Sequence, residues 1–323
     1  MSTQEGWEGW EGWEGWEGWS GGPGGGGGGG SGGSALMQAG ERFRESVVYG
    51  TPPTGLQPWP APPDRALRQL SVYARRHVVV MDLLRGFDIG GNEAKVQLAS
   101  SAVPGWAWQI ARPAPAAFDT AGVESMASLR PARSAEILAQ LNFNPALWSG
   151  ILPLSPQRTP CTLELMAAAV MFASLLVQRV KLIFNLARPC ELSPRIQPMI
   201  ATPGFSTFPS GHATESRLVS DLLSTLLARA QAPAGWAGPV DRMLVALADR
   251  IAENREVAGV HFSVDSTAGA ALGSQLARLL AARADAAARS AGTAAVDGRA
   301  APFAALWQMA LQEWAHADSA VAA

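Results

Sequence analysis

Long apolar stretches with helical spacing dominate the chain from about residue 130 onward. Within each stretch, apolar side chains recur at positions i, i+3 and i+4, the pattern of an amphipathic helix. The longest stretch begins at Thr159 and Pro160, a favourable helix start, and ends near Ala187 because Pro189 follows. No alternating strand pattern competes, so we predict an all-α helical bundle. The expected helices are 64–84, 132–141, 160–187, 211–230, 240–257, 265–290 and 302–315.

The first 34 residues differ in composition from the rest. Five tandem copies of Glu-Gly-Trp at residues 5–19 precede runs of glycine and serine, and the tail contains 16 of the chain's 34 glycines. Glycine at this density loses much backbone entropy on ordering, which predicts that residues 1–34 are disordered and carry no chemistry. Regularly spaced tryptophan beside glutamate leaves open an interaction tag. We expect residues 35–323 to form a single helical domain.

Charge and cysteine content limit the class of protein. The chain contains 25 Lys and Arg against 27 Asp and Glu, a net charge of −2. This balance argues against a nucleic-acid binder with a basic face and against electrostatic attraction to anionic lipid, but it allows a local basic pocket. The two cysteines, Cys161 and Cys190, lack the spacing of a thiolate zinc site or a disulfide scaffold.

The sequence also gives an expectation about membranes. The N-terminal region lacks the basic and apolar segments of a signal peptide. The densest apolar stretch, residues 165–177, is 13 residues long, shorter than the ~20 residues that cross a bilayer. We therefore predict no membrane span and a cytoplasmic location.

Three groups of polar residues are candidates for a functional site, and the first is a pair of cations. Lys181 and Arg188 are seven residues apart near the end of the long helix. Seven residues are two helical turns, so both side chains leave one face about 10 Å apart along the axis. They can bind one anion, or simply complement the helix dipole.

The second group is the sequence Pro-Ser-Gly-His at residues 209–212, where a proline-rich loop meets a helix. Ser210 lies at the N-cap position, and the amides of Gly211 and His212 point from the positive end of the helix. These donors suit an anion, and His212 can exchange a proton near neutral pH. The alternative is a capped helix with an incidental histidine.

The third group is Arg255, His261 and Asp265. The four-residue step from His261 to Asp265 lets the carboxylate hold one imidazole nitrogen, which leaves the other free as a nucleophile or ligand. Gly259 provides a bend that can turn Arg255 and His261 toward one cavity. The alternative is a surface arginine followed by an aspartate that caps the next helix.

The three groups occur in the order Lys-x6-Arg-Pro, Pro-Ser-Gly-His and Arg-x5-His-x3-Asp, within residues 160–280. This ordered combination resembles the three-part signature of the type 2 phosphatidic acid phosphatase and vanadium haloperoxidase superfamily. One departure is Asn254, where many phosphatase members have a supporting serine. The resemblance implies the helical bundle of acid phosphatases and vanadium haloperoxidases.

The resemblance also implies a role for each residue. The groups that would bind the phosphoryl oxygens are Lys181, Arg188, Ser210, Gly211 and Arg255. His261, oriented by Asp265, would attack phosphorus and form a phosphohistidine. His212 would protonate the leaving oxygen and then deprotonate the water that hydrolyses the intermediate.

Two enzymatic functions fit this pattern. The first is an acid phosphatase-type hydrolase that needs no cofactor and acts on a small phosphate ester. The second is a vanadium-dependent haloperoxidase, which would hold vanadate in the same pocket with His261 as axial ligand and oxidise halide with hydrogen peroxide. A third possibility is a non-catalytic binding protein that uses the tryptophan tail.

Overall fold

The computed structural model describes residues 65–230, 237–292 and 296–315. The tail at 1–34, with the interaction tag that its repeats leave open, lies outside the described residues. The helices in this part of the chain are α3 (Arg65–Arg68), α4 (Val72–Leu84), α5 (Thr120–Met126), α6 (Arg130–Ala139), α7 (Ala146–Ser149), α8 (Pro160–Phe184), α9 (Pro189–Leu192), α10 (Gly211–Arg229), α11 (Ala237–Val257), α12 (Ser263–Ala291) and α13 (Pro302–Ala315).

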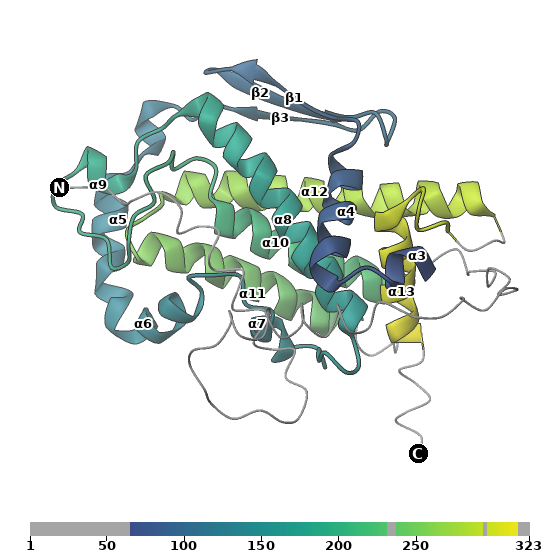
Figure 1. Cartoon of the computed structure of the whole chain (residues 1–323). Helices are drawn as coiled ribbons and strands as arrows, with labels where there is room; N and C mark the ends of the chain where they lie inside the picture. The colour runs from purple at the N-terminus through teal and green to yellow at the C-terminus, as the bar shows by residue number, and fades with distance from the viewer. Residues whose placement is uncertain (1–64, 231–236, 293–295, 316–323) are drawn as a thin grey trace, which may run out of the picture. The chain divides into compact units, whose positions relative to one another are not determined.

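Four long helices form the centre of the described domain. Helix α10 packs against α8, α11 and α12 (Figure 1), and α4 and α13 cover another side of α8. The predicted helical bundle is confirmed, and most expected helix ends lie within three residues of the observed ones. The expected helix at 64–84 is instead two helices, because Ser71 caps a new start and accepts a hydrogen bond from the Ala74 amide at 3.2 Å.

Two glycines bring the start of α10 close to α12. A Cβ atom added to Gly269 would lie 2.5 Å from the Ser210 carbonyl oxygen, and one added to Gly273 would collide with the Thr214 carbonyl. Only glycine permits so close an approach of the two backbones. The contact fixes the N-terminal turn of α10 against the first turns of α12.

The prediction that no strand pattern is present is wrong. Strands β1 (Phe87–Asn92), β2 (Lys95–Ser100) and β3 (Ala107–Ala111) form an antiparallel sheet in the order β1-β2-β3. Val96 and Leu98 of β2 alternate inward and are fully buried. Strands of five or six residues carry only two or three such positions, so their period is weak beside that of long helices.

The prediction that no segment can span a membrane is also wrong. The 33 residues from Pro160 to Leu192, which contain α8, are long and apolar enough to cross a bilayer. The stretch at 165–177 gives too short an apolar length, because the helix continues past Val177 to Phe184 with only two charged residues, Arg179 and Lys181. In the described structure, 72% of the most apolar part of this segment is buried within the protein.

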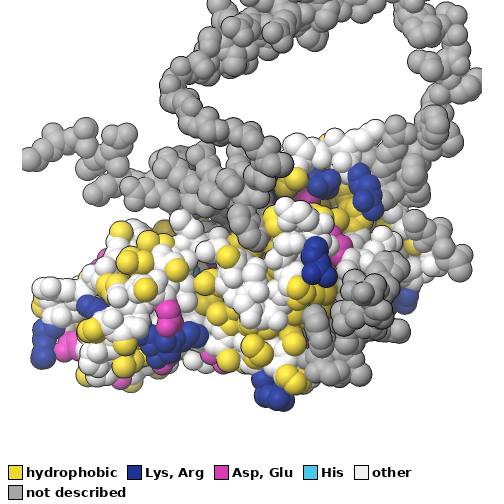
Figure 2. Space-filling view, turned by 90° about the horizontal axis from the view of Figure 1, so that it is seen from below, with side chains coloured by type: hydrophobic (Ala, Val, Ile, Leu, Met, Phe, Trp, Pro, Cys, Tyr) yellow, Lys and Arg dark blue, Asp and Glu magenta, His cyan; other side chains and the backbone are white. Residues whose placement is uncertain are grey.

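The charged surface agrees with the small net charge. On the face drawn in Figure 2, Lys and Arg side chains lie in several separate groups among hydrophobic side chains, and no continuous basic surface forms there. Figure 2 therefore shows no extended basic patch of the kind that binds nucleic acid.

Candidate active site

The site is built around the first turn of α10. Ser210 is fully buried at the N-cap position, and its side chain accepts a hydrogen bond from the Ala213 amide at 3.4 Å. Its own amide donates to the Asp265 carbonyl at 3.0 Å, which ties α10 to α12. Gly211 follows, with open space around its Cα except for a Glu215 oxygen 3.9 Å from where a Cβ would lie. A side chain at Gly211 would therefore begin without a clash.

His261 and Asp265 make the contact that their spacing predicts. His261 Nδ1 lies 3.0 Å from Asp265 Oδ2, and both side chains are buried. The same carboxylate oxygen accepts a hydrogen bond from the Phe262 amide at 2.9 Å, so Asp265 also caps α12. Both roles considered for Asp265 are thus present. A proton on Nδ1 donated to the carboxylate leaves the lone pair of Nε2 free.

Thr207 is a further partner of this pair. Its hydroxyl hydrogen-bonds Asp265 Oδ2 and lies 3.2 Å from His261 Nδ1. Burial lowers the pKa of His261 to about 4; the Asp265 hydrogen bond opposes this shift, and the charges of Lys181 and Arg188 add to it. His261 is therefore neutral at pH 7, the state in which an imidazole nitrogen can act as a nucleophile.

Lys181 and Arg188 converge on one short segment of chain. Lys181 Nζ donates to the carbonyls of Ser206 and Thr207, at 2.6 and 3.0 Å. Arg188 Nε donates to the Phe205 carbonyl at 2.9 Å, and the Phe205 ring lies 5.0 Å from Lys181 Nζ and 5.2 Å from Arg188 Cζ. Both cations are buried, and backbone carbonyls bind them where the sequence predicted an anion.

Arg255 has donors with no partner. Its Nη2 donates to the Ile137 carbonyl at 3.0 Å and to Gln140 Oε1 at 3.2 Å. Its Nε and Nη1 are buried without a hydrogen bond. Burial lowers the pKa of Arg255 to about 10, so the guanidinium remains charged at neutral pH. Buried donors of a charged group that lack partners are costly, and an anion would satisfy them.

His212 faces the segment after α6. Its Nε2 lies 2.9 Å from the Gln140 carbonyl and 3.3 Å from the Leu141 carbonyl, so Nε2 carries a proton and donates it. Burial lowers the pKa of His212 to about 3, with smaller contributions from the charges of Arg255 and His261. His212 and Arg255 thus share Gln140 as a hydrogen-bond partner, His212 through its backbone carbonyl and Arg255 through its side chain.

Comparisons with known proteins cover the same region. The family model of the PAP2 superfamily matches residues 162–287, which contain all three groups of predicted site residues. This segment belongs to the PAP2 superfamily. Membership supports phosphatase-type activity. A comparison with curated proteins found no match.

Solved structures also match this chain, and one of them is of a PAP2 type protein. It is the crystal structure of a transmembrane PAP2 type phosphatidylglycerolphosphate phosphatase from Bacillus subtilis. The match covers 67% of this chain and 88% of that chain, with 16% sequence identity and a TM-score of 0.30. The expected cytoplasmic location without a membrane span is corrected, because the segment Pro160–Leu192 is long and apolar enough to cross a bilayer.

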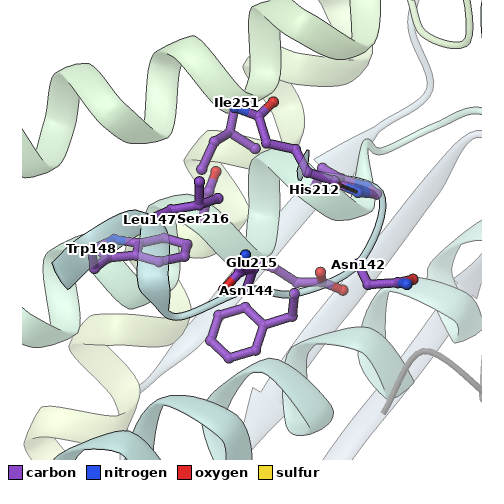
Figure 3. Close-up of a pocket in the computed structure, with 10 residues that line it drawn as sticks. Asn142, Asn144, Leu147, Trp148, His212, Glu215, Ser216 and Ile251 are labelled. Carbon is purple, nitrogen blue, oxygen red and sulfur yellow. Dashed lines mark hydrogen bonds between the residues drawn. The ribbon is translucent and has the colours of Figure 1, made fainter. Parts of the chain in front are cut away.

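A small hollow with about 20 Å³ of interior space lies beside His212. Its lining residues are Gln140, Asn142, Phe143, Asn144, Leu147, Trp148, His212, Glu215, Ser216 and Ile251. Of the predicted site residues, only His212 lines it. Figure 3 shows Trp148 at one end, His212 and Asn142 at the other, and Glu215 between them.

Sequence reasoning missed Thr207, Gln140 and Glu215. Glu215 lies three residues after His212, on the same face of α10, which was the one available signal. Thr207 and Gln140 belong to segments outside the signature, and only the packing of the chain brings them to Asp265 and Arg255.

Proposed function

We propose that this protein is a phosphatase that hydrolyses a phosphomonoester through a phosphohistidine intermediate on His261, without a cofactor. The observation that supports it most is the state of His261. The ring is buried and neutral because burial lowers its pKa to about 4, and the Asp265 carboxylate holds its Nδ1. The match to the PAP2 superfamily model also supports phosphatase-type activity.

The cations would bind the phosphoryl group. The unpartnered Nε and Nη1 of Arg255 are ready to donate to phosphate oxygens. Lys181 and Arg188 would exchange the carbonyls of residues 205–207 for phosphate oxygens, which are stronger acceptors because they are charged. The Ser210 hydroxyl and the Gly211 amide, at the start of α10, would complete the binding site.

The proposed reaction has two steps. In the first, His261 Nε2 attacks phosphorus, the bond from phosphorus to the leaving oxygen breaks, and His212 gives that oxygen a proton. In the second, His212 takes a proton from water, the water oxygen attacks phosphorus, and the bond to Nε2 breaks. Free phosphate leaves, and both histidines return to their starting states.

The protonation of His212 depends on the substrate. In the described structure the pKa of His212 is about 3, because burial and the charge of Arg255 disfavour the imidazolium. A bound phosphate dianion would raise this pKa by adding negative charge beside the ring. Substrate would thereby convert His212 into the acid that the first step needs.

The same groups would also hold vanadate, which resembles phosphate in shape and charge. His261 would hold the vanadium through Nε2. No observation favours halide oxidation, so we do not propose the haloperoxidase function.

The test is hydrolysis of p-nitrophenyl phosphate by the full chain and two variants. We expect His261→Ala to lower kcat by at least a thousandfold, because the nucleophile is lost. His77→Gln is the matched control, since His77 lies on α4 and its Nδ1 contacts the Tyr73 carbonyl of its own helix. Wild-type protein without phosphatase activity, or His261→Ala with undiminished activity, would contradict the proposal.

A further inference from the structure

The C-terminal end of α6 meets two side chains of the proposed active site. Gln140 is the C-terminal cap of this helix, and its backbone carbonyl accepts a hydrogen bond from His212 Nε2 at 2.9 Å. The Ile137 carbonyl, in the last turn, accepts from Arg255 Nη2 at 3.0 Å. Carbonyls at the end of a helix carry partial negative charge and can accept donors from outside it. The end of α6 therefore binds both His212 and Arg255.

The Gln140 side chain adds a second hydrogen bond to Arg255. Its Oε1 accepts from Arg255 Nη2 at 3.2 Å. Together with the Ile137 carbonyl, it provides one acceptor for each of the two hydrogens on Nη2. Because the guanidinium is planar, anchoring Nη2 fixes the directions of Nε and Nη1, which are buried without a hydrogen bond. Gln140 thus holds Arg255 by one nitrogen and leaves the other donors for an anion.

Asn254 holds the Gln140 side chain in place. Its Nδ2 donates to Gln140 Oε1 at 3.0 Å and to Glu136 Oε2 at 3.1 Å, and its Oδ1 accepts from Arg133 Nη1 at 3.1 Å. The side chain of Asn254 is fully buried, and these three bonds give its amide a single orientation. Gln140 Oε1 is therefore fixed from one side by Asn254 while it accepts from Arg255 on the other.

Gln140 lies outside the segment that matches the PAP2 superfamily. The family model covers residues 162–287, which include His212, Asn254 and Arg255. Helix α6 packs against α11 (Figure 1), and this contact brings Gln140 to the start of α10 and the end of α11. A helix that the signature does not contain therefore contributes to the geometry of the site.

We propose that Gln140 is a positioning residue that fixes Arg255 through its side chain and His212 through its backbone carbonyl. The donors that would bind the phosphoryl group and the group that would protonate the leaving oxygen then keep one orientation relative to each other. The use of these two groups in catalysis rests on the proposed function, whereas their orientation by Gln140 does not. Because one residue holds both groups, releasing its side chain should disturb both.

Three variants of the full-length protein test this role. Gln140→Met keeps the length of the side chain but has no oxygen to accept from Arg255. Gln140→Glu is the conservative variant, because its carboxylate still offers that oxygen. Arg250→Gln is the matched control: it breaks two hydrogen bonds of 2.7 Å between α11 and Glu136 of α6, and Arg250 makes no hydrogen bond to Gln140 or Arg255 within the described residues. A urea titration shows that each variant is folded.

The first readouts are the Kd of inorganic phosphate and kcat for two esters, p-nitrophenyl phosphate and phenyl phosphate. In Gln140→Met, phosphate should bind about tenfold more weakly, the size of one hydrogen bond to a charged group. Phenol is the poorer leaving group and needs the proton from His212 more, so kcat for phenyl phosphate should fall about tenfold further than kcat for p-nitrophenyl phosphate.

The other two variants separate positioning from packing. Gln140→Glu should restore the wild-type ratio of kcat between the two esters, and Arg250→Gln should change neither this ratio nor the phosphate Kd. If Gln140→Met loses stability but keeps the wild-type phosphate Kd and ester ratio, the residue has a structural role only and the proposal is overturned.

A second readout does not depend on the proposed function. NMR measures how fast the hydrogens on His212 Nε2 and Arg255 Nη2 exchange with solvent. Both should exchange at least about tenfold faster in Gln140→Met than in wild type, and at the wild-type rate in Arg250→Gln. If Gln140→Met does not fold, Asn254→Ser takes its place, because it removes the donor that holds Gln140 Oε1.

The two readouts distinguish the two claims. Faster exchange of both hydrogens in Gln140→Met, without hydrolysis by the wild type, supports the positioning role and contradicts the phosphatase function. Hydrolysis by the wild type, with exchange in Gln140→Met equal to that in Arg250→Gln, overturns the positioning role and leaves the phosphatase function standing.

Discussion

Individual side chains in this site are held by several partners each. Asp265 Oδ2 accepts from the Phe262 amide, the Thr207 hydroxyl and His261 Nδ1. The carboxylate therefore fixes the tautomer and direction of His261 while it also starts α12. Asp265 therefore couples the orientation of the His261 ring to the start of α12.

Asp265→Asn tests the orienting role. The asparagine oxygen can still cap α12, but its amide group no longer specifies which nitrogen of His261 carries the proton. We expect kcat for p-nitrophenyl phosphate to fall on the order of a thousandfold, with a small change in melting temperature. Thr207→Val removes only a supporting hydrogen bond and should cost about tenfold. An Asp265→Asn variant that keeps more than a tenth of wild-type kcat would contradict the role.

Two histidines with lowered pKa values also predict how stability depends on pH. The pKa of His261 is about 4 and that of His212 about 3, both below 6.5, because burial disfavours the charged ring. Below pH 6.5 the unfolded chain takes up protons that the folded chain does not, so the free energy of unfolding falls as pH drops from 6.5 to 4.

His212→Gln isolates one of these contributions. Glutamine keeps a donor for the Gln140 carbonyl but does not titrate. Its free energy of unfolding, measured by urea titration, should fall less steeply between pH 6.5 and 4 than that of wild type, by at most about 1.4 kcal/mol per pH unit. Parallel slopes for the two proteins would show that His212 is not buried in the neutral form.

At the scale of elements, the contact between α10 and α12 positions the site. Gly269 and Gly273 let the α12 backbone approach the Ser210 and Thr214 carbonyls. Ser210 and Asp265, which lie at the starts of these two helices, are joined by a backbone hydrogen bond of 3.0 Å. The close approach therefore holds the first amides of α10 beside the Asp265 and His261 pair.

Gly273→Ala tests this packing. The added Cβ would collide with the Thr214 carbonyl and crowd the Leu218 amide, so we expect a loss of about 1–3 kcal/mol in the free energy of unfolding. Gly238→Ala in α11 is the control, because its Cβ would meet only the end of the Arg242 side chain, 3.4 Å away. That change should be neutral or stabilise by up to about 1 kcal/mol. Equal effects at the two glycines would argue against the close contact.

At the scale of the whole molecule, long helices were predictable and short strands were not. Helix α10 is expected at 211–230 and observed at Gly211–Arg229, because its apolar period extends over five turns and Ser210 marks its start. The sheet at residues 87–111 was missed because each strand offers two or three inward positions. The length of the apolar segment Pro160–Leu192 was underestimated because the 13-residue stretch stops before Arg179 and Lys181, although the helix continues past both.

Within the site, only the contact between residues close together in the sequence was predictable. Spacing alone predicted the contact of His261 with Asp265. It could not predict that backbone carbonyls would bind Lys181 and Arg188, because these depend on the path of residues 205–207. Glu215 was missed because an isolated glutamate gains meaning only from the hollow that folding builds around it.

The central claim is that His261 carries the phosphoryl group during turnover. The most direct measurement is to mix full-length protein with phenyl phosphate, quench it in alkali within milliseconds, and map phosphate by mass spectrometry of the peptides. We predict an alkali-stable, acid-labile phosphate on the peptide that contains His261, absent in His261→Ala and present in His77→Gln. Turnover without any phosphorylated peptide, or phosphate on a different residue, would contradict the account.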